Sequence, residues 1–493
     1  MLYSIDGLLI AILVSPLIGA ICLIAIPSEE EKLLKLTALN FTSFSFLGTL
    51  ILWACFQKST PYFQYVNQLH WVHPIKFGLD GISLFFLLLT TFLIPLCILA
   101  SWRSVSFNLK GFLLAFVALD FFLIGAFAVL DLFFFYVFFE SVLIPMFFII
   151  GIWGSRERKI LAAYYFFLYT LLGSASMLLS ILYLYNQVGT ADYEVLLVRS
   201  FSTSEQLWVW LTLFLGFASK VPMMPVHLWL PEAHVEAPTA GSVILAGVLL
   251  KLGTYGFIRF NLPLFPKGCF FFTPLVYMLA VMGIIYASLT AIRQTDFKRI
   301  IAYTSIAHMN LVILGIFSFN IIGIEGAILQ SLSHGFIASG LFLVIGVVYD
   351  RYGSRLVQYY GGLATTMPLY SIIFLVLTMS NISFPGTSSF IGEFLLLLGS
   401  FQINTTVSFL GATSVVLGGT YSLWLFNRVV FGNLKNQYTE SFFDVSLREV
   451  ILFLPLILCI LITGVYPNIL LDSMHMSVTA LVERISFYSD IYI

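Results

Sequence analysis

The amino-acid sequence predicts an all-α polytopic membrane protein, and three observations carry this prediction. Of its 493 residues, 60% are hydrophobic and 10% are charged, whereas soluble globular proteins carry roughly 25% charged residues. Apolar runs that can cross about 30 Å of hydrocarbon, at about 1.5 Å per helical residue, recur along the whole chain. Lysine and arginine gather in every second loop between these runs, as the positive-inside rule describes.

The apolar runs number about fourteen, and we expect each of them to form one transmembrane helix. The first run has neither a basic segment before it nor a small-residue cleavage site, so it is interpreted as the first span and not as a removed signal. The expected spans cover residues 7–26, 36–56, 80–101, 112–130, 132–153, 161–185, 207–230, 240–260, 272–291, 299–319, 322–349, 367–398, 406–431 and 449–467.

The loops on the two sides of the membrane differ in charge. Assigning successive loops to opposite sides puts fifteen basic residues on one side and six on the other, so both termini are expected on the side with six. The two remaining basic residues, Lys220 and Lys251, fall inside expected spans. The fifteen are Lys32, Lys35, Arg103, Lys110, Arg156, Arg158, Lys159, Arg293, Lys298, Arg299, Arg351, Arg355, Arg428, Lys435 and Arg448.

Spans 7 and 12 contain signals for broken helices. In span 7 Lys220 is followed by Pro222, and in span 12 Pro385 precedes Glu393. Proline removes a helical hydrogen bond and so frees a backbone carbonyl at membrane depth, which usually lines water or ions. Because the breaks lie five spans apart, they favour a five-helix unit used twice in inverted orientation. The alternative is that proline is simply common in membrane helices.

This repeat gives a plan for the whole chain. The segment LLDSMHMSVTALVERISF near the end carries apolar residues at helical spacing, which predicts an interfacial amphipathic helix at 470–487. The plan assigns helices 1 to 3 to residues 1–111, the first repeat (helices 4 to 8) to 112–260, the second (helices 9 to 13) to 261–431, and helix 14 with the amphipathic tail to 432–493.

Ionisable residues inside the apolar runs are the main functional candidates, because a charge in hydrocarbon is costly and usually marks a transport path. Glu140 lies in the run FFFYVFFESVLIPMFF, roughly 13 Å of helix beyond the border of its span. Lys220 lies at the first break, and Lys251 lies too deep in span 8 for its amine to reach the surface. The candidate proton relay consists of Glu140, Lys220, Lys251, His308, His334 and Glu393.

The charges of this set can control one another. Burial disfavours the charged forms of Glu140 and Lys220, whereas pairing favours both. If Glu140 moves away or is neutralised, Lys220 can release its proton toward Lys251 and the histidines, whose side chains titrate near neutral pH. The pattern therefore predicts a proton relay with an electrostatic gate.

For the other ionisable residues, a structural role explains the sequence about as well as a role in the proton relay. A single histidine on an apolar helix is more often a hydrogen-bonded core residue, and an acid at a helix end is often a cap. The ionisable residues near the first break either line an inlet for protons or are simply solvated side chains near a loop. The secondary relay candidates are Asp120, Asp131 and His227, and the possible inlet residues are Glu232, His234 and Glu236.

Several classes of function lack their motifs. The five cysteines show no CxxC spacing, which argues against an iron–sulfur cluster, structural zinc or a disulfide framework. No glycine-rich phosphate loop follows a strand-like run, so nucleotide binding is unsupported, and we expect no nucleic-acid partner.

Five stretches of the chain resemble the chain 4 family of NADH-ubiquinone oxidoreductase, the antiporter-like membrane-arm subunits of respiratory complex I, and most closely its plant and algal mitochondrial members. The resemblance covers nearly the whole chain, and the stretch at 220–256 is the most specific. The stretches are FGLDGISLFFLLLTTFLIPLCIL (77–99), DLFFFYVFFESVLIPMFFIIGIWGSRERKI (131–160), KVPMMPVHLWLPEAHVEAPTAGSVILAGVLLKLGTYG (220–256), RIIAYTSIAHMNLV (299–312) and SFPGTSSFIGEFL (383–395).

The resemblance implies fourteen helices, two inverted repeats and a proton path through the buried residues. By motif, Glu140, Lys220 and Lys251 match the family's acid in helix 5 and lysines in helices 7 and 8, and Glu393 matches its acid in helix 12. His308 and His334 match the central polar axis. The resemblance also implies that the chain holds no cofactor, while NAD, FMN, iron–sulfur clusters and ubiquinone belong to other subunits of the complex.

The resemblance further implies a setting in the mitochondrial inner membrane. The expected partners are membrane lipids, accessory subunits and other membrane-arm subunits, especially the antiporter-like chains 2 and 5. Three alternatives remain at this point: a cation/proton antiporter subunit, a structural spacer in the membrane arm, and a member of the related photosynthetic complex of plastids.

Overall fold

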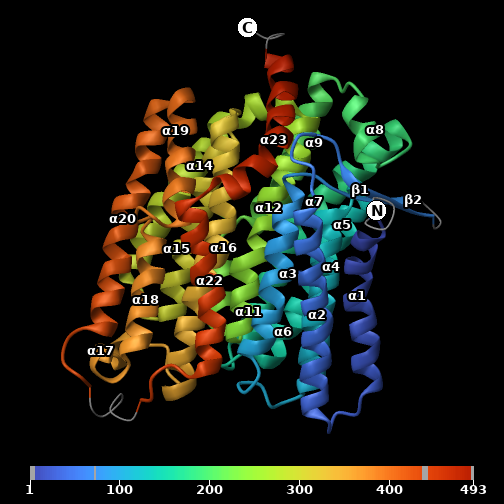
Figure 1. Ribbon diagram of the computed structural model, residues 1–493. Helices are drawn as coiled ribbons and strands as arrows, with labels where there is room; N and C mark the ends of the chain where they lie inside the picture. The colour runs from blue at the N-terminus through green and yellow to red at the C-terminus, as the bar shows by residue number, and fades with distance from the viewer. Residues whose placement is uncertain (1–5, 71–73, 436–441, 490–493) are drawn as a thin grey trace.

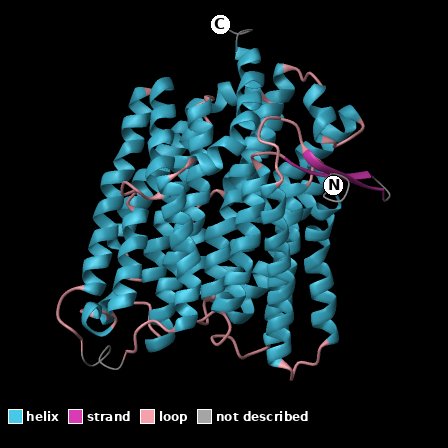
Figure 2. Ribbon diagram, in the orientation of Figure 1, coloured by secondary structure: helices cyan, strands magenta, loops and turns pink. Residues whose placement is uncertain are grey.

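The computed structural model describes residues 6–70, 74–435 and 442–489, and long helices running side by side dominate it (Figures 1 and 2). One end of the bundle carries the strands β1 and β2 and the helices α8 and α23, and we call it the hairpin end (Figure 1). The opposite end carries α17 and the loops in which the fifteen basic residues were expected, and we call it the basic end (Figure 1).

The first helices of the chain follow the expected spans closely. The helix of span 5 is interrupted at Val142, three residues before Pro145, whose ring nitrogen cannot donate a helical hydrogen bond. These helices are α1 (Asp6–Ala25), α2 (Glu31–Ala54), α3 (Ser83–Ala100), α4 (Leu109–Ala128), α5 (Leu132–Ser141), α6 (Leu143–Trp153) and α7 (Lys159–Val188).

Two polar stretches fold at the hairpin end into structure that the sequence did not predict. The strands β1 (Gln64–His70) and β2 (Pro74–Leu79) pair antiparallel, and α8 (Tyr193–Val198) lies beside them. Lys76 Nζ lies 2.5 Å from Asp192 Oδ2, at the N-cap of α8. This hydrogen bond raises the pKa of Lys76, so the hairpin is tied to α8 by a charged contact.

The middle of the chain holds the first helix break and a span with two π-helical segments. Helix α9 ends at Lys220, and α10 begins at Trp229. The elements are α9 (Thr203–Lys220), α10 (Trp229–Glu236), α11 (Thr239–Ile244), η2 (Leu245–Leu249), α12 (Leu250–Gly256), η3 (Phe257–Asn261), α13 (Leu262–Leu264), α14 (Pro266–Arg293), α15 (Phe297–Ile316) and α16 (Ile321–Tyr352).

The last part of the chain contains the second break. Helix α18 ends at Asn381 and α19 begins at Ser388, on either side of Pro385. The tail forms α23, where a helix was expected at 470–487. The elements are η4 (Val357–Tyr359), α17 (Leu363–Thr366), α18 (Pro368–Asn381), α19 (Ser388–Ile403), α20 (Thr405–Val430), α22 (Leu447–Val465) and α23 (Asn468–Ser489).

Among the described residues, twelve helices are long and apolar enough to cross a membrane. The two other expected spans are the broken ones, α9 with α10 and α18 with α19. The sequence thus predicted the helical membrane fold, while the count of fourteen spans and the inverted repeat stay predictions.

Two spans form the fully buried centre of the bundle. The apolar windows of α16 and of the span Thr239–Leu264 are buried along their whole length, whereas only 39% of the corresponding window is buried in α1 and in α7. Glycines let the central helices approach closely: a Cβ on Gly247 would lie 2.5 Å from Leu93 and 2.8 Å from the Ser339 hydroxyl. Polar side chains on these two spans therefore face other protein groups and not lipid.

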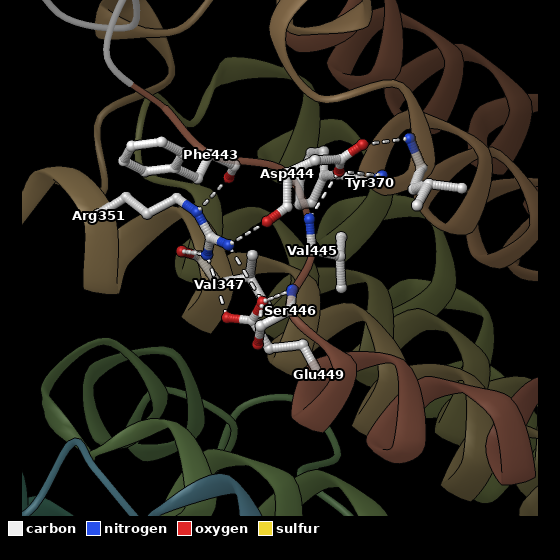
Figure 3. Close-up of polar contacts among 9 residues, drawn as sticks. Val347, Arg351, Tyr370, Phe443, Asp444, Val445, Ser446 and Glu449 are labelled. Atoms are coloured by element: carbon white, nitrogen blue, oxygen red, sulfur yellow. Dashed lines mark hydrogen bonds and ion pairs between the residues drawn. The ribbon is translucent and has the colours of Figure 1, made fainter.

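A polar network fixes the basic ends of three helices (Figure 3). The Arg351 guanidinium, on α16, donates to both carboxylate oxygens of Glu449, on α22, at 3.1 and 3.0 Å. The Asp444 carboxylate accepts hydrogen bonds from the backbone amides of Leu369 and Tyr370 at 2.9 and 3.1 Å. These amides lie in the first turn of α18, where helical amides lack an internal partner. The network thereby joins α16 and α22 to the first half of the broken span 12.

Candidate functional site

Lys251 and His334 meet at the centre of the bundle. Lys251 Nζ lies 2.8 Å from His334 Nδ1, on α16, and both side chains are buried. The same ammonium donates to the carbonyl of Ala246 at 2.5 Å, five residues earlier. Ala246 belongs to the π-helical segment η2, and such segments are frequent at functional sites because they alter the regular carbonyl pairing.

The buried polar row continues from His334 to the second broken span. The rings of His334 and His308 are 5.8 Å apart between centroids. His308 Nδ1 lies 3.0 Å from Glu393 Oε1, although the ring is not aligned for a regular hydrogen bond. Gln330 Nε2 donates to the same Glu393 oxygen at 3.1 Å. Four of the six predicted relay residues, namely Lys251, His334, His308 and Glu393, therefore form one continuous row.

The remaining two relay candidates form a second group. Lys220 is 1% exposed and lies over the Phe139 ring, 4.5 Å from its centroid, with the Phe139 carbonyl 3.5 Å from Nζ. Glu140 is the next residue along α5, and its carboxylate interacts electrostatically with Lys220 and accepts a hydrogen bond from the Ser174 side chain. Within the described part of the chain Lys220 makes no direct ion pair. Glu140 and Lys220 thus interact through space without a direct ion pair, so their pairing stays a prediction, and one buried Glu140 oxygen lacks a hydrogen-bond partner in the described structure.

Both helix breaks are closed by specific polar contacts. At the first break the Trp229 indole donates to the Ser219 carbonyl at 2.9 Å, which satisfies an oxygen freed at the end of α9. At the second break the Ser389 hydroxyl donates to the Ser380 carbonyl. Ser383 has a φ of 62°, a left-handed conformation that turns the chain between the half-helices. The breaks are therefore ordered elements that hold Lys220 and Glu393 in place.

The secondary candidates lie outside the row. Asp120 is fully buried on α4 and accepts a hydrogen bond from the Ser45 hydroxyl at 3.2 Å, toward α2. Asp131 caps α5 by accepting from the Phe134 amide at 2.9 Å, which is the structural alternative considered for it. His227 lies in the first break and is partly exposed.

A buried charged cluster, hereafter the basic-end cluster, consists of Glu236, Asp296, Lys298 and Arg355. Lys298 Nζ donates to the Ala237 carbonyl at 2.6 Å, and the Arg355 guanidinium lies 3.8 Å from Glu236 and 3.9 Å from Asp296. Arg355 is 1% exposed, yet none of its three guanidinium nitrogens has a hydrogen-bond partner in the described structure. The sequence did not identify Lys298 or Arg355 as candidates, because both lie at span borders and were counted as loop charges.

His234 lies between this cluster and the central row. It is fully buried, stacks on Phe342 at 4.6 Å between centroids, and interacts electrostatically with both Lys298 and Lys251. Neither of its ring nitrogens has a hydrogen-bond partner in the described part of the chain. Glu236 is 2% exposed, so it and His234 are not solvated residues, whereas Glu232 is partly exposed and pairs with Arg299 at 2.6 Å.

A cavity opens beside the basic-end cluster. It has a volume of about 300 Å³ and is lined by Ser104, Ser106, Thr239 and Asp350, among others. Asp350 interacts electrostatically with Lys298. Among the described residues, no three His, Cys, Asp or Glu side chains are placed to hold a metal ion.

Comparison with known proteins connects this arrangement to a family. Residues 129–418 match the sequence profile described as "NADH:quinone oxidoreductase/Mrp antiporter, TM". The chain is 55% identical over 490 residues to NADH-ubiquinone oxidoreductase chain 4 of Arabidopsis thaliana, covering 99% of this chain and 98% of that protein. The chain belongs to the NADH-ubiquinone oxidoreductase chain 4 family. The Glu140 region, both breaks and the row from Lys251 to Glu393 all fall within the matched profile.

Two solved structures have the same fold as this chain. A chain of respiratory complex I from Thermus thermophilus with bound NADH is 30% identical, has a TM-score of 0.88, and is matched over 97% of this chain and 99% of that one. A chain of the Mrp complex from Dietzia sp. DQ12-45-1b, at 19% identity, has a TM-score of 0.85 over 99% of both chains. The second likeness concerns the fold alone.

Proposed function

We infer that this chain is a proton-pumping membrane subunit of respiratory complex I, and we propose that its buried polar row carries the protons. Membership of the chain 4 family supports the first statement. The observation that carries the second is that Lys251, His334, His308 and Glu393 follow one another in a buried row, with the two imidazole rings 5.8 Å apart between centroids. Such intramembrane ionisable chains are typical of proton relays.

The geometry suggests the order of steps in the row. A proton on Lys251 Nζ passes to His334 Nδ1 along their 2.8 Å contact. The 5.8 Å between the imidazole centroids requires a ring rotation or one bridging water before His308 receives it. His308 then hands the proton to Glu393 across 3.0 Å. Gln330 holds the receiving oxygen in position through its amide N–H.

Glu140 acts in this proposal as the gate and not as a carrier in the row. When its carboxylate is charged, the through-space attraction favours the ammonium form of Lys220. Neutralising Glu140 removes that attraction and leaves Lys220 over the Phe139 ring and carbonyl alone. Lys220 then gives up its proton more readily, toward Lys251.

Protons enter, in this proposal, through the basic-end cluster. The cavity lined by Asp350 opens next to Lys298, and the unpartnered nitrogens of Arg355 and His234 are polar atoms that ordered water can satisfy. His234 links this region to Lys251. We therefore propose that His234 and Glu236, which the sequence already offered as inlet candidates, act as inlet residues together with Lys298.

The redox chemistry belongs to other chains in this proposal. NAD, FMN, iron–sulfur clusters and ubiquinone are held elsewhere in the complex, and the chain forms part of NADH:ubiquinone reductase, EC 7.1.1.2. The neighbours are the antiporter-like chains 2 and 5, the accessory subunits and membrane lipids, and the membrane is the mitochondrial inner membrane. We also propose that residues 112–260 and 261–431 form two inverted repeats, in which the two broken spans would occupy equivalent positions.

One experiment separates this function from the alternatives. The intact complex is purified through a tag on this chain, reconstituted in vesicles, and supplied with NADH and a soluble quinone. We expect NADH-driven proton uptake into the vesicles that does not depend on sodium. Sodium-dependent proton flux by the chain alone would favour a cation/proton antiporter. Normal pumping after simultaneous replacement of Lys251, His334, His308 and Glu393 would favour a structural spacer.

A further inference from the structure

The cavity beside the basic-end cluster has one charged side chain among its lining residues, Asp350 near the end of α16. Four hydroxyl side chains line the same cavity, on Ser104, Ser106, Ser155 and Thr239. A volume of about 300 Å³ with several polar groups suits ordered water, because each water needs polar partners. Asp350 is also exposed to solvent. The carboxylate therefore lies where a polar cavity meets the surface of the basic end.

The cavity wall contacts the basic-end cluster at two places. The Ser155 amide donates to the Glu236 carbonyl at 3.0 Å, and Lys298 donates to the carbonyl of the residue that follows Glu236. On the other side, the Arg355 guanidinium lies over the Tyr349 ring, 5.8 Å from its centroid. Ser155 and Tyr349 both line the cavity. The cavity thus lies directly beside the group of residues that contains Lys298.

The Asp350 carboxylate has neither an ion pair nor a hydrogen bond within the described part of the chain. Its neighbour Glu449 differs in this respect, because it accepts from Arg351 and from the Ser446 amide. Figure 3 shows that the Arg351 donors point to Glu449 and to backbone carbonyls. Of these two acids, Glu449 is held in an ion pair, whereas Asp350 is free to bind and release a proton.

Charges on three helices and two loops surround Asp350. Three cations and one acid interact electrostatically with it, and two exposed arginines lie next to lining residues of the cavity. The cations favour the carboxylate, while packing of part of the side chain against protein favours the neutral acid, so both forms are accessible. The charged groups are Lys298 on α15, Arg351 on α16, Arg448 and Glu449 on α22, and Arg103 and Arg156 in the loops.

We propose that Asp350 collects protons at the mouth of this cavity and supplies them to Lys298. This inference rests on the proposed function, because it gives the inlet its first acid. The carboxylate takes up a proton from bulk water, waters in the cavity carry the proton across, and the Lys298 amine accepts it while the carboxylate is regenerated. A fixed negative charge also raises the local concentration of cations, protons included, at the cavity mouth. Asp350 thereby speeds the reprotonation of Lys298.

The test measures the initial rate of NADH-driven pumping by intact complexes in vesicles that start with the same pH on both sides. We expect Asp350→Asn to pump about tenfold more slowly than the wild type at about pH 8.5, where protons are scarce, and within about twofold of it at about pH 6.5. Asp350→Glu should pump like the wild type at both pH values, because the acid survives on a longer side chain.

Glu157→Gln is the matched control. Glu157 is an exposed acid two residues from the lining residue Ser155, but it does not itself line the cavity. We expect this variant to pump like the wild type at both pH values. An equal loss in Glu157→Gln and Asp350→Asn would show a general effect of surface charge and would overturn the proposal.

Two further results would reject Asp350 as the collecting acid. Wild-type pumping by Asp350→Asn at alkaline pH would show that protons enter without it, and a loss of the same size at both pH values would assign it a structural role. If the Asp350→Asn complex does not assemble, Asp350→Ser carries the same expectations. The variant Lys251→Met separates this inference from the proposed function: normal pumping in Lys251→Met rejects the relay, whereas its loss beside normal pumping in Asp350→Asn rejects the collecting acid alone.

Discussion

Lys251 Nζ and His334 Nδ1 lie 2.8 Å apart between two fully buried helices, one of which is π-helical next to the lysine. At this distance one proton is shared between an amine and an imidazole, and burial excludes bulk water from competing for it. The pair is therefore the strongest link of the proposed relay, and it can be tested directly.

Replacing Lys251 by methionine keeps most of the length of the unbranched side chain and removes the proton carrier. We expect proton pumping by the assembled complex to fall by roughly a hundredfold, the scale at which a positioned proton-transfer group contributes. Lys32→Met, at an exposed lysine of the basic end, is the control and should pump normally. Pumping is measured as NADH-driven quenching of a pH-sensitive dye in vesicles, and normal quenching in Lys251→Met would remove Lys251 from the path.

Glu140→Gln should uncouple or stall the relay while the redox sites stay intact. Without the carboxylate, the positive charge on Lys220 loses its compensation inside the membrane, where an unpaired charge costs several kcal/mol. We expect a large loss of coupled pumping and of quinone-dependent turnover, with unchanged NADH oxidation by an artificial acceptor. Glu140→Asp should do less harm. A normal proton-to-electron ratio in the Gln variant would assign Glu140 a structural role.

At the far end of the row, Glu393→Gln removes the acceptor that His308 contacts at 3.0 Å. The glutamine still can accept from Gln330, so the fold should persist while pumping falls at least about tenfold. Gln330→Leu is the matched variant, because it deletes the hydrogen bond to Glu393 and keeps the acid. Gln330→Leu should lower pumping less than Glu393→Gln does. A larger loss of pumping in Gln330→Leu than in Glu393→Gln would show that the proton path depends on the Gln330 amide and not on the Glu393 acid.

Arg351→Ala should weaken the fold at the basic end and spare the chemistry. Both Glu449 oxygens would lose their charged donor, and breaking one partner of a largely buried pair costs about 3 kcal/mol. The thermal unfolding of the complex and its assembly on native gels measure this loss. Arg351→Lys should be intermediate, since an ammonium cannot donate to both oxygens in the same fork. Unchanged assembly and unfolding in the alanine variant would show that the network in Figure 3 is dispensable.

The excess of basic residues in the loops of one side predicts that the basic end faces the mitochondrial matrix and that both termini face the intermembrane space. A cysteine at Ser155, which is exposed at the basic end, should react with a membrane-impermeant reagent only when the matrix side is open. A cysteine at Val198, which is 88% exposed in α8, should react from the intermembrane side. Both are made in a Cys55→Ser background, and the opposite labelling pattern would invert the topology.

The sequence predicted the apolar spans and marked all four residues of the central row as candidates for the same physical reason. A charge within an apolar run, as at Glu140 or Lys251, is conspicuous because hydrocarbon offers it no solvation. Lys298 and Arg355 were missed because a basic residue at a span border is ordinarily a solvated loop charge, and only tertiary packing buries these two. The sequence pattern alone identifies a charged residue inside an apolar run, whereas the residue that contacts it is determined by the tertiary fold.

The sequence also did not predict two local features of the structure. The strand β1 reads QYVNQLH, with too few apolar residues to signal a sheet, and its partner β2 is stabilised by a contact with α8 far along the chain. The π-helical segments on either side of Lys251, LAGVL in η2 and FIRFN in η3, share no residue pattern that would distinguish them from a regular helix. Packing against α16 and α9, and not propensity, decides these conformations.

The two π-helical segments set the angular phase of the span that carries Lys251. Each π turn accommodates one residue more than an α turn, and one residue corresponds to about 100° of rotation around a helix axis. The stretch from Leu250 to Gly256 can therefore be oriented independently of the helix before η2 and of Arg259, which pairs with Asp80 at the hairpin end. A register shift confined to one π turn would swing Lys251 away from His334 without moving either end of the span.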